Sequence, residues 1–253
     1  MTRHALVTGG GSGIGAATAR ALSAAGWRVS VAGRRPAPLE ATLATLAGPR
    51  GIAATLDVTD EASVTAAVAA VEAVAPVDLL VNNAGAAASA PFQRTTPALF
   101  HEMIAVNLTG TFLVTRAILP GMVARGRGRV VNVASTAGLV GYPYVSAYVA
   151  AKHGVVGLTR ALALEVARRG VTVNAVCPGF TDTPLIDASV ATIAEKTGRD
   201  ADAARAELAR SNPQGRLVSP EEVAATVVWL ASDAASAING QAIAVAGGEV
   251  MTG

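Results

Sequence analysis

The sequence has few of the residues that cross-link small proteins or bind metals. It contains one cysteine, Cys177, and three histidines among 253 residues. A single cysteine cannot form an internal disulfide and the histidine spacing does not suggest a zinc site, so we expect no metal centre and a reducing compartment. Aromatic residues make up only 4% of the chain, against 51% hydrophobic residues. The interior must therefore be built mainly from Ala, Val, Leu and Ile, and disorder is excluded.

Charges are also few, at 15% of the residues, and they are balanced. Twenty Lys and Arg residues against eighteen Asp and Glu residues give a net charge of +2, so nucleic acid is not an expected partner. The N-terminus reaches glycines before any apolar stretch long enough for a signal peptide, and the longest charge-free stretch, residues 130–151, is interrupted by polar residues, Gly and Pro. We therefore predict a soluble, cytoplasmic protein without a membrane partner.

Short β-branched runs alternate with longer Ala-rich stretches of helical periodicity. This alternation predicts an α/β fold, a single Rossmann-like domain over residues 1–253 with a doubly wound parallel sheet. Seven strands are expected at residues 5–8, 28–32, 52–56, 79–82, 129–134, 171–176 and 241–245. Helices are expected at residues 13–25, 38–46, 61–74, 97–125, 147–169 and 220–231. No linker or internal repeat divides the chain, which favours one domain.

Residues 180–216 do not follow this alternation. The segment comes after a predicted strand, has no strand of its own and shows weak helical patterns at residues 187–196 and 201–209. An insertion at this place in an open α/β sheet lies above the carboxyl ends of the strands, where ligands bind. We therefore predict a small helical lid over a substrate pocket.

A glycine-rich loop joins the first predicted strand to the first helix. Its sequence at residues 8–15, Thr-Gly-Gly-Gly-Ser-Gly-Ile-Gly, allows positive φ angles and removes Cβ atoms, so that the backbone can approach a pyrophosphate at the helix N-terminus. The alternative is a tight turn that needs glycine for geometry alone. The strand before the loop, the helix after it and the second strand beyond favour dinucleotide binding.

The end of the second predicted strand bears on the choice of dinucleotide. An acidic residue there would bind a ribose 2′-hydroxyl, but the sequence has Gly33 followed by Arg34 and Arg35. Guanidinium groups can bind a 2′-phosphate, so NADP(H) is favoured and NAD(H) is the alternative. The other interpretation is that both arginines are a solvated start to the next helix.

Tyr148 and Lys152 are four residues apart, which places both on one face of a helix. An ammonium about 4 Å from a phenol favours the phenolate by about 4 kcal/mol at an effective dielectric constant of about 20. Such a tyrosine can exchange a proton with an alcohol or ketone oxygen, and Ser135, after the fifth predicted strand, can donate to that oxygen. The alternative is that Tyr148 and Lys152 are only surface neighbours. Asn107 is a further polar residue, in an otherwise apolar helical stretch, and its alternative interpretation is a buried amide that the backbone satisfies.

Six motifs occur in order along the chain. They are the glycine loop at residues 8–15, Asn-Asn-Ala-Gly at residues 82–85, Asn107, Ser135, Tyr148-x-x-x-Lys152 and Pro178-Gly179-x-x-x-Thr183. This combination resembles the classical short-chain dehydrogenase/reductase family over essentially the whole chain. The resemblance implies reversible hydride transfer between a nicotinamide and a ketone or secondary alcohol.

The resemblance also implies roles for individual residues. Tyr148 is implied as the acid/base, and Lys152 as the partner that lowers its pKa and binds the ribose. Ser135 is implied as the donor to the substrate oxygen, and Asn107 as the residue that holds a proton-relay water.

A cofactor-binding set follows from the same resemblance. The implied residues are Gly9, Ser12, Gly13, Ile14 and Gly15 in the pyrophosphate loop; Arg34, Arg35, Asp57, Val58, Asn83, Ala84 and Gly85 toward the adenosine; and Tyr148, Lys152, Pro178, Gly179, Thr181 and Thr183 toward the nicotinamide. Arg34 stands one place beyond the acidic position of NAD-preferring members. Ser12 departs from the pattern, because many NADP-dependent members carry a basic residue in that loop.

The expected substrate pocket is mostly apolar, which favours a hydrophobic carbonyl compound over a sugar. Its residues are Ser135, Ala137, Tyr142, Tyr148 and Phe180. Basic groups near the pocket can receive phosphates of coenzyme A or of a carrier-protein arm, unless they are ordinary solubilising charges. The candidates are Arg125, Arg127 and Arg129 before the fifth strand, and Lys196, Arg199, Arg205 and Arg210 in the lid.

The C-terminal sequence, residues 212–251, also resembles 3-oxoacyl-thioester reductases and 3-hydroxyacyl-CoA dehydrogenases. A 3-oxoacyl or 3-hydroxyacyl thioester is therefore the predicted substrate, and a small hydrophobic or aryl ketone is the alternative. A non-catalytic NADP-sensing regulator with this fold usually lacks the tyrosine or the lysine, and both are present here. The family commonly forms tetramers, so we expect a homotetramer through residues 97–125, 147–169 and 241–253. Cys177 is interpreted as small buried packing.

Overall fold

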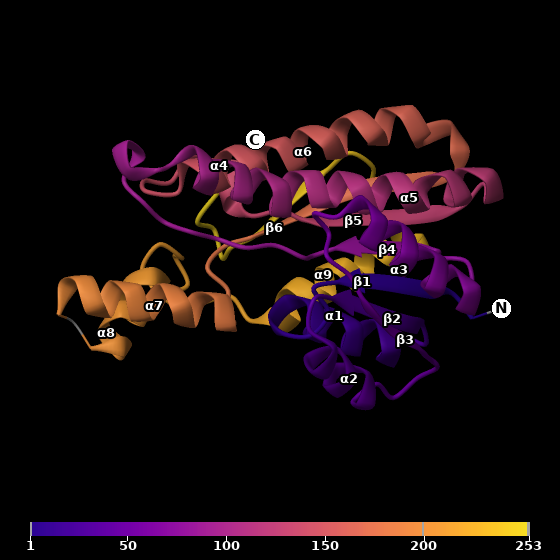
Figure 1. Ribbon diagram of the computed structural model, residues 1–253, viewed down its shortest axis with the longest axis horizontal. Helices are drawn as coiled ribbons and strands as arrows, with labels where there is room; N and C mark the ends of the chain where they lie inside the picture. Colours follow the sequence, from indigo (N-terminus) through magenta and orange to yellow (C-terminus); the bar gives the residue numbers. More distant parts are fainter. Residues whose placement is uncertain (1, 199, 252–253) are drawn as a thin grey trace.

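The computed structural model describes residues 2–198 and 200–251 and contains a seven-stranded parallel sheet (Figure 1). The strand order is β3-β2-β1-β4-β5-β6-β7. The strands are β1 (His4–Thr8), β2 (Arg28–Gly33), β3 (Arg50–Thr55), β4 (Leu79–Asn82), β5 (Gly128–Val133), β6 (Val171–Pro178) and β7 (Ala242–Val245). The predicted Rossmann-like α/β fold and its seven strands are confirmed.

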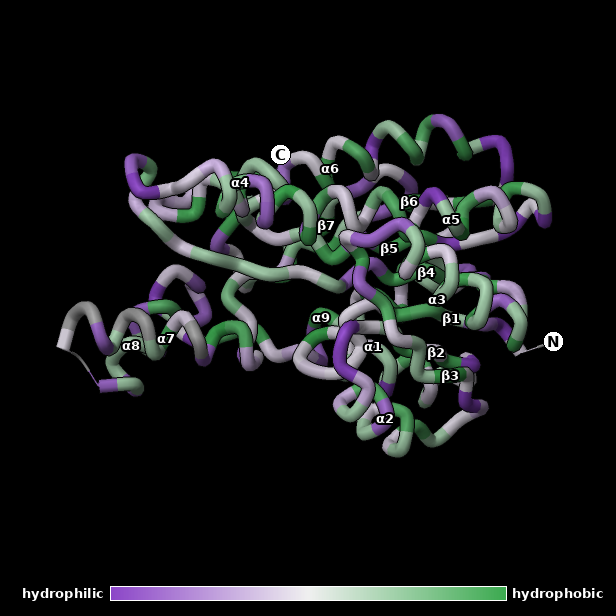
Figure 2. Tube along the Cα trace, viewed as in Figure 1, coloured by the Kyte–Doolittle hydropathy of each residue, from purple (hydrophilic) through white to green (hydrophobic). Residues whose placement is uncertain are grey.

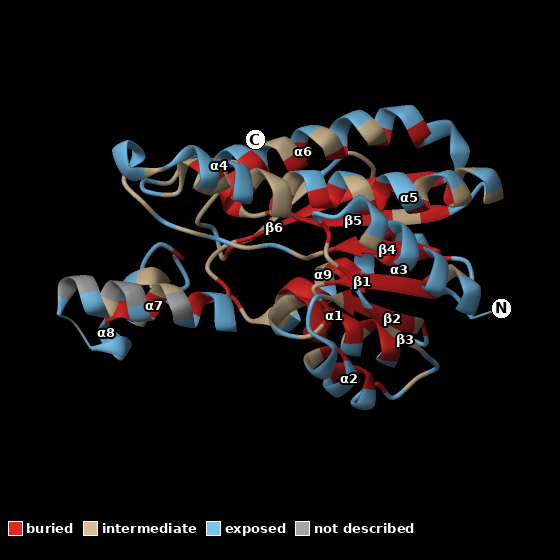
Figure 3. Cartoon of the chain, viewed as in Figure 1, coloured by how far each residue is buried: buried red, intermediate tan, exposed pale blue. Residues whose placement is uncertain are grey.

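Helices cover both faces of the sheet. One face packs against α1 (Gly13–Ala24), α2 (Pro36–Ala44) and α9 (Pro220–Ala231). The other packs against α3 (Glu61–Val74), α5 (Gly110–Arg125) and α6 (Ser146–Val166), and α4 (Pro97–Ile104) lies beside α6. Figure 3 shows the buried residues gathered in the strands and on the inner faces of these helices.

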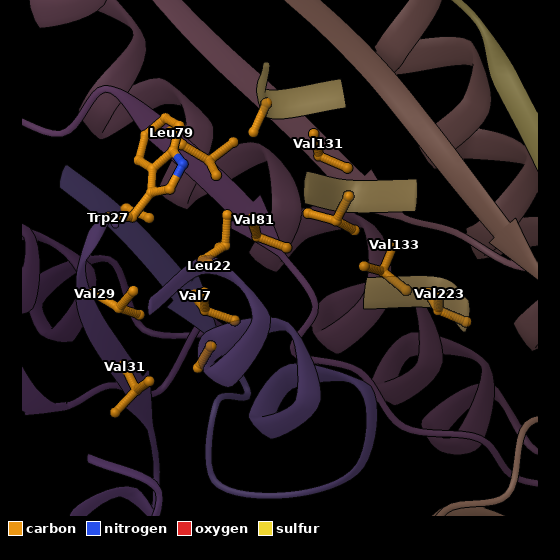
Figure 4. Close-up of a cluster of buried hydrophobic side chains, with 14 of the residues drawn as sticks. Val7, Leu22, Trp27, Val29, Val31, Leu79, Val81, Val131, Val133 and Val223 are labelled. Carbon is orange, nitrogen blue, oxygen red and sulfur yellow. The ribbon is translucent and has the colours of Figure 1, made fainter. Parts of the chain in front are cut away.

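The two faces are filled by alternate residues of each strand. In β1, Val7 belongs to the cluster under α1 and α9, whereas Leu6 belongs to the cluster under α3 and α5. Successive side chains of a strand point to opposite faces, so a parallel strand covered on both sides is apolar throughout. Figure 2 shows this hydrophobic stretch along β1, and Figure 4 shows Val7 in the first cluster with Leu22 of α1 and Val223 of α9.

The predicted helix over residues 97–125 is not continuous. α4 ends at Ile104, α5 begins at Gly110, and Ala105–Thr109 between them form a π-helical turn. Such turns are rare and are frequently found at functional sites. The turn places Asn107 in the interior, where it is 1% exposed.

Residues 97–125 are also long and apolar enough to cross a membrane, by length and composition alone. Their inward face packs on the sheet, because Val114, Ile118 and Met122 are fully buried in the cluster shared with the strands. We therefore describe α5 as a core helix of this fold.

The predicted lid is helical and projects from the body beyond β6 (Figure 1). It contains α7 (Pro184–Thr197) and α8 (Ala201–Ala209), whose small apolar cluster includes Ile186 and Ala204. As predicted, the described residues of 180–216 contain no strand of their own. Thr181 forms an isolated parallel bridge with Val218, just after the segment, and this bridge fixes the base of the lid.

Candidate active site

The predicted site residues come together at the carboxyl edge of the sheet. The glycine loop follows β1, the Asn-Asn-Ala-Gly segment includes the end of β4, and Ser135 and Gly179 follow β5 and β6. β1 and β4 are neighbours in the sheet although β2 and β3 come between them in the chain. The connections therefore diverge between β1 and β4, and ligands of open α/β sheets bind at such a switch point.

The loop after β4 holds the loop after β1. Asn83 Nδ2 donates hydrogen bonds to the carbonyls of Thr8, at 3.0 Å, and Gly9, at 3.2 Å. The Thr8 hydroxyl in turn accepts from the backbone N–H groups of Asn83 and Ala84, both at 3.0 Å. A Cβ on Gly15 would overlap the Gly9 carbonyl and lie 2.5 Å from Asn83 Nδ2. Close packing of these loops therefore requires glycine at position 15.

The start of α1 fits a pyrophosphate. Ser12 is the N-cap, and its side chain makes no capping hydrogen bond. The first N–H groups of a helix lack intrahelical partners and attract anions, and the described first turn carries no acidic side chain. Gly13 has a φ of +50°, and a Cβ there would lie 3.1 Å from Thr183 Cγ2. The base of the lid therefore borders the same backbone cradle, whose donors suit the phosphates of a dinucleotide.

Arg34 and Arg35 are exposed where β2 ends and α2 begins. Within residues 2–198 and 200–251, neither guanidinium forms an ion pair. Hydrogen bonds from the hydroxyl and N–H of Thr59 hold the pKa of Asp57 below its ordinary value, and the charge of Arg34 adds to this effect. Val58 is buried, so its side chain belongs to the core.

Tyr148 and Lys152 both lie on α6, as the spacing predicts. Lys152 Nζ is 5.6 Å from the centre of the Tyr148 ring and donates a 2.9 Å hydrogen bond to the carbonyl of Val133, the last residue of β5. The lysine is 5% exposed, and burial lowers its pKa to about 8. At pH 7 the side chain therefore remains mostly charged.

Burial has the opposite effect on Tyr148, because it disfavours the charged form of each group. It raises the pKa of the phenol, while a hydrogen bond with the Ser135 side chain acts to lower it. The net pKa of Tyr148 is therefore raised in the chain by itself and not lowered, because desolvation outweighs the effect of Lys152, whose ammonium donates its hydrogen bond to the Val133 carbonyl. The phenol keeps its proton at neutral pH, which is the form that can protonate an oxyanion.

Ser135 is oriented by the backbone that follows it. Its Oγ accepts a 3.1 Å hydrogen bond from the N–H of Ala137, so the hydroxyl proton remains available for donation. Ala137 is buried and contributes to the site through this N–H rather than through its methyl group. Ser135 and Tyr148 therefore converge on one place, where a substrate oxygen can meet both hydroxyls.

Asn107 fixes the loop after β4 beside the lysine. Its Nδ2 donates to the carbonyls of Ala86, at 2.9 Å, and Met103, at 3.0 Å, and its Oδ1 accepts from the N–H of Ala86 at 3.3 Å. A Cβ on Gly85 would lie 2.8 Å from Asn107 Oδ1 and 3.7 Å from Lys152 Nζ. The amide is thus satisfied by the backbone, as the alternative interpretation of this residue predicts.

The predicted pocket residues Tyr142 and Phe180 face each other, with ring centres 6.3 Å apart in an edge arrangement. The Tyr142 hydroxyl donates to Glu249 Oε1 at 2.7 Å and lies 2.9 Å from Thr136 Oγ1, which can donate to it. Burial and the Glu249 carboxylate raise the pKa of Tyr142 to about 12. Glu249 is a residue that the sequence analysis missed; its only signal was an acidic residue directly after Gly-Gly.

The segment after β6 lies on the nicotinamide side of the site implied by the resemblance. Pro178 ends β6, Thr181 Oγ1 donates to the Gly179 carbonyl at 2.9 Å, and Thr183 Oγ1 donates to the Thr181 carbonyl at 3.2 Å. Cys177 is fully buried, and desolvation raises the pKa of its thiol to about 11. A protonated, inaccessible thiol confirms the interpretation of Cys177 as packing.

The arginines before β5 do not lie near the pocket, so that expectation is wrong. Arg127 forms a 3.1 Å ion pair with Asp78, and Arg125 donates to the Val77 carbonyl at 2.7 Å. Residues at the start of a parallel strand lie at the amino edge of the sheet, opposite the carboxyl edge that carries the site. Arg129, the second residue of β5, belongs to the same edge.

Two of the lid cations form ion pairs with carboxylates of the lid itself. Arg205 bonds to Asp182 at 2.6 Å and Asp187 at 2.7 Å, and Arg210 pairs with Glu207 at 3.0 Å. Arg199 and the side chain of Lys196 lie outside the described residues. A role of Arg205 and Arg210 in binding substrate phosphates is therefore not supported.

Comparison with known proteins agrees with this geometry. Residues 3–194 match the short chain dehydrogenase family, and the chain belongs to it. A Streptomyces virginiae protein named as a ketoacyl reductase of the monensin polyketide synthase is 44% identical, over 98% of this chain and 97% of its own length. The acetoacetyl-CoA reductase of Rhizobium meliloti is 42% identical, over 98% and 99%.

A solved structure gives the same result. Actinorhodin polyketide ketoreductase, in a variant crystallised with NADPH, has a TM-score of 0.94 and 41% identity, covering 98% of this chain and 97% of that one. The chain is therefore an oxidoreductase that acts on CH–OH groups, interconverting ketones and secondary alcohols with a nicotinamide dinucleotide.

Proposed function

We propose that the chain reduces 3-oxoacyl thioesters, or oxidises 3-hydroxyacyl thioesters, with NADP(H). The observation that carries the reaction is the convergence of Ser135 and a protonated Tyr148 beside the buried ammonium of Lys152. The reduced nicotinamide, when bound, supplies the hydride that the carbonyl carbon receives. Tyr148 gives its phenolic proton to the developing alkoxide, and the Ser135 hydroxyl stabilises the negative charge on that oxygen.

The proposed preference for NADP(H) rests on charge. Arg34 and Arg35 are exposed at the end of β2 and form no ion pair among the described residues, so both can bind a 2′-phosphate. The residue at the end of the strand is Gly33, which leaves no carboxylate there for a ribose 2′-hydroxyl. The related ketoreductase crystallised with NADPH supports the same choice.

The proposed thioester substrate rests on the names of the relatives and on the mostly apolar character of the residues expected in the pocket. One relative is named for a ketoacyl group and another for acetoacetyl-CoA, whose acyl group is a 3-oxoacyl group. Because Arg205 and Arg210 are paired within the lid, we place recognition on the acyl group rather than on phosphates of a carrier. A small hydrophobic or aryl ketone is the second candidate, favoured by the edge-packed rings of Tyr142 and Phe180.

The test follows oxidation of NADPH and NADH with acetoacetyl-CoA, its N-acetylcysteamine analogue and an aryl ketone. We expect NADPH to be preferred and both thioesters to be reduced, the analogue showing that carrier phosphates are dispensable. Tyr148→Phe should lower kcat at least 100-fold and leave the Kd for NADPH within twofold. Tyr144→Phe, at an exposed tyrosine, is the matched control and should retain activity. Turnover by Tyr148→Phe at the wild-type rate would refute the mechanism, and reduction of the aryl ketone alone would refute the substrate.

A further inference from the structure

Glu249 places a carboxylate inside the region where the substrate is expected. Oε1 accepts the 2.7 Å hydrogen bond from Tyr142, while Oε2 is buried and accepts no hydrogen bond from the described residues. Carboxylate oxygens are strong acceptors, and buried ones are normally satisfied. The buried and unpartnered Oε2 therefore indicates a role for Glu249 in ligand recognition.

The surroundings of the Glu249 carboxylate include residues of the expected pocket. A Cβ on Gly179 would lie 2.7 Å from Oε2, so the carboxylate faces the backbone directly after β6. Oε1 accepts its hydrogen bond from Tyr142, and the ring of Tyr142 packs edge-on against the ring of Phe180, a predicted pocket residue. Thr136, next to Ser135 in the chain, lies 2.9 Å from the same tyrosine hydroxyl. The carboxylate thus lies beside Tyr142, which links it to Phe180 and to Thr136, the residue after Ser135.

No cation neutralises this charge within the described residues. Glu249 forms no ion pair among the described residues, and the Tyr142 hydroxyl and the Gly179 backbone that its carboxylate faces are neutral. The buried ammonium of Lys152 is engaged with the Val133 carbonyl. Two like charges interact strongly where water is excluded, so a second carboxylate brought into this pocket would be repelled.

We propose that Glu249 is a specificity-determining residue that excludes free 3-oxo acids and admits their uncharged esters and thioesters. The inference rests on the proposed function, because it concerns which 3-oxo compounds reach Ser135 and Tyr148. A 3-oxo acid and its ester present the same ketone and differ in the charge two carbons away. The carboxylate of Glu249 discriminates between them by repulsion, a form of selection against the wrong ligand.

A purely structural role for Glu249 makes a different prediction. If the carboxylate served only to hold Tyr142, an acceptor without charge would serve equally well. Glu249→Gln keeps an acceptor oxygen for the Tyr142 hydroxyl and removes the charge. The variant therefore separates electrostatic exclusion from the positioning of Tyr142.

The experiment compares kcat/KM for acetoacetate and ethyl acetoacetate, both with saturating NADPH, in wild type, Glu249→Gln and Glu249→Ala. We expect wild type to prefer the ester at least tenfold, and each variant to narrow that preference at least tenfold by gaining activity on the acid. Melting curves show which of the two Glu249 variants is folded, and one folded variant is enough for the comparison with wild type. Asp233→Asn, which removes an exposed charge paired with Arg3, should keep the wild-type ratio.

Each outcome decides a different claim. If the ester is reduced and a folded Glu249 variant leaves the ester-to-acid ratio within twofold of wild type, the inference is overturned and the proposed function stands. If Asp233→Asn narrows the ester-to-acid ratio as much as the Glu249 variants do, the effect comes from the net charge of the protein, and the inference is again overturned. If wild type reduces neither compound nor any thioester, the proposed function fails and the inference fails with it.

Discussion

The Nζ atom of Lys152 lies 5.6 Å from the centre of the Tyr148 ring, yet it donates its hydrogen bond to the carbonyl of Val133. The ammonium is therefore anchored to the end of β5, and its influence on the phenol is electrostatic. Burial moves the two pKa values apart, because it raises that of Tyr148 and lowers that of Lys152 to about 8. Near pH 7 the phenol is protonated and the lysine is mostly charged.

This arrangement predicts the pH dependence of ketone reduction. The active form has a neutral Tyr148 and a charged Lys152, so kcat/KM should be level below about pH 7 and fall as the pH rises through about 8, where Lys152 loses its proton. Initial rates with NADPH from pH 6 to pH 10 give the profile. Lys152→Ala should lose most of the activity and the decline near pH 8. A wild-type profile that stays level to pH 10 would contradict the assignment.

Gly85 gives a second prediction, because its Cα borders both Asn107 and Lys152. A Cβ there would lie 2.8 Å from Asn107 Oδ1, which forces a shift beside the lysine. Gly85→Ala should lower kcat/KM at least tenfold while the fold is kept. Gly157→Ala is the matched control, since a Cβ at this glycine of α6 meets nothing within 4 Å. It should leave activity unchanged and increase stability by about 0.5–1 kcal/mol. Equal kinetics for the two variants would exclude a role of Gly85 in positioning the lysine.

The strands could be predicted closely because parallel strands buried on both faces are continuous apolar runs between turn residues. β4 occupies Leu79–Asn82 as predicted, whereas β3 begins at Arg50, two residues before the prediction. The π-helical turn at Ala105–Thr109 could not be predicted, because apolar residues continue through it into α5. The single-domain organisation, the cytoplasmic location and the homotetramer stay predictions.

The tetramer prediction gains indirect support from surface composition. Phe112 of α5 and Leu164 of α6 are large apolar side chains that are 45% and 83% exposed. A shallow apolar groove of about 310 Å³ includes Phe112 and Leu162 on the same pair of helices. Residues 252–253 of the expected interface lie outside the described residues.

The site was predictable where a motif carried it and not where distant residues meet. Tyr148, Lys152 and Ser135 follow from local spacing, but the bond between Tyr142 and Glu249 joins residues 107 positions apart. The buried bonds from Asn82 to Thr115 and Asn132 likewise link separate elements under the site.

The failed expectation for Arg127 has a simpler cause. A residue just before a parallel strand must lie at the amino edge of the sheet, and sequence order alone contained that information.

Asn107 provides a third prediction, on stability and activity together. Asn107→Ala removes three hydrogen bonds to Ala86 and Met103 and leaves buried backbone groups with fewer partners. A loss of about 2 kcal/mol in the free energy of unfolding is expected. It corresponds to a fall in Tm of about 4–8 °C for a chain of this size. Because the loop after β4 is released beside Lys152, kcat should fall more than KM rises.

Thr111→Val is the matched control for Asn107→Ala. It removes a hydroxyl that donates to the Asn107 carbonyl at 2.9 Å and leaves the amide bonds of Asn107 in place. Its effect on kcat should stay within twofold. An Asn107→Ala variant with wild-type kcat and lowered Tm would reduce Asn107 to a structural residue.

His4 predicts a loss of stability in mild acid, remote from the site. It is fully buried in β1, with Nδ1 2.7 Å from the Ala75 carbonyl and Nε2 2.9 Å from Ser30 Oγ, and burial lowers its pKa below the ordinary value of 6.5. The unfolded chain therefore binds a proton that the folded chain does not. The stabilisation is complete above pH 6.5 and is lost as the pH falls from there toward the folded pKa, by up to about 1.4 kcal/mol per pH unit.

Urea unfolding at pH 7.5 and 5.5 measures this loss as a difference in the free energy of unfolding. The difference should be smaller for His4→Gln than for wild type, whereas His101→Gln, at an exposed histidine, should keep the wild-type difference. Identical pH dependence in wild type and His4→Gln would assign the acid sensitivity to other groups.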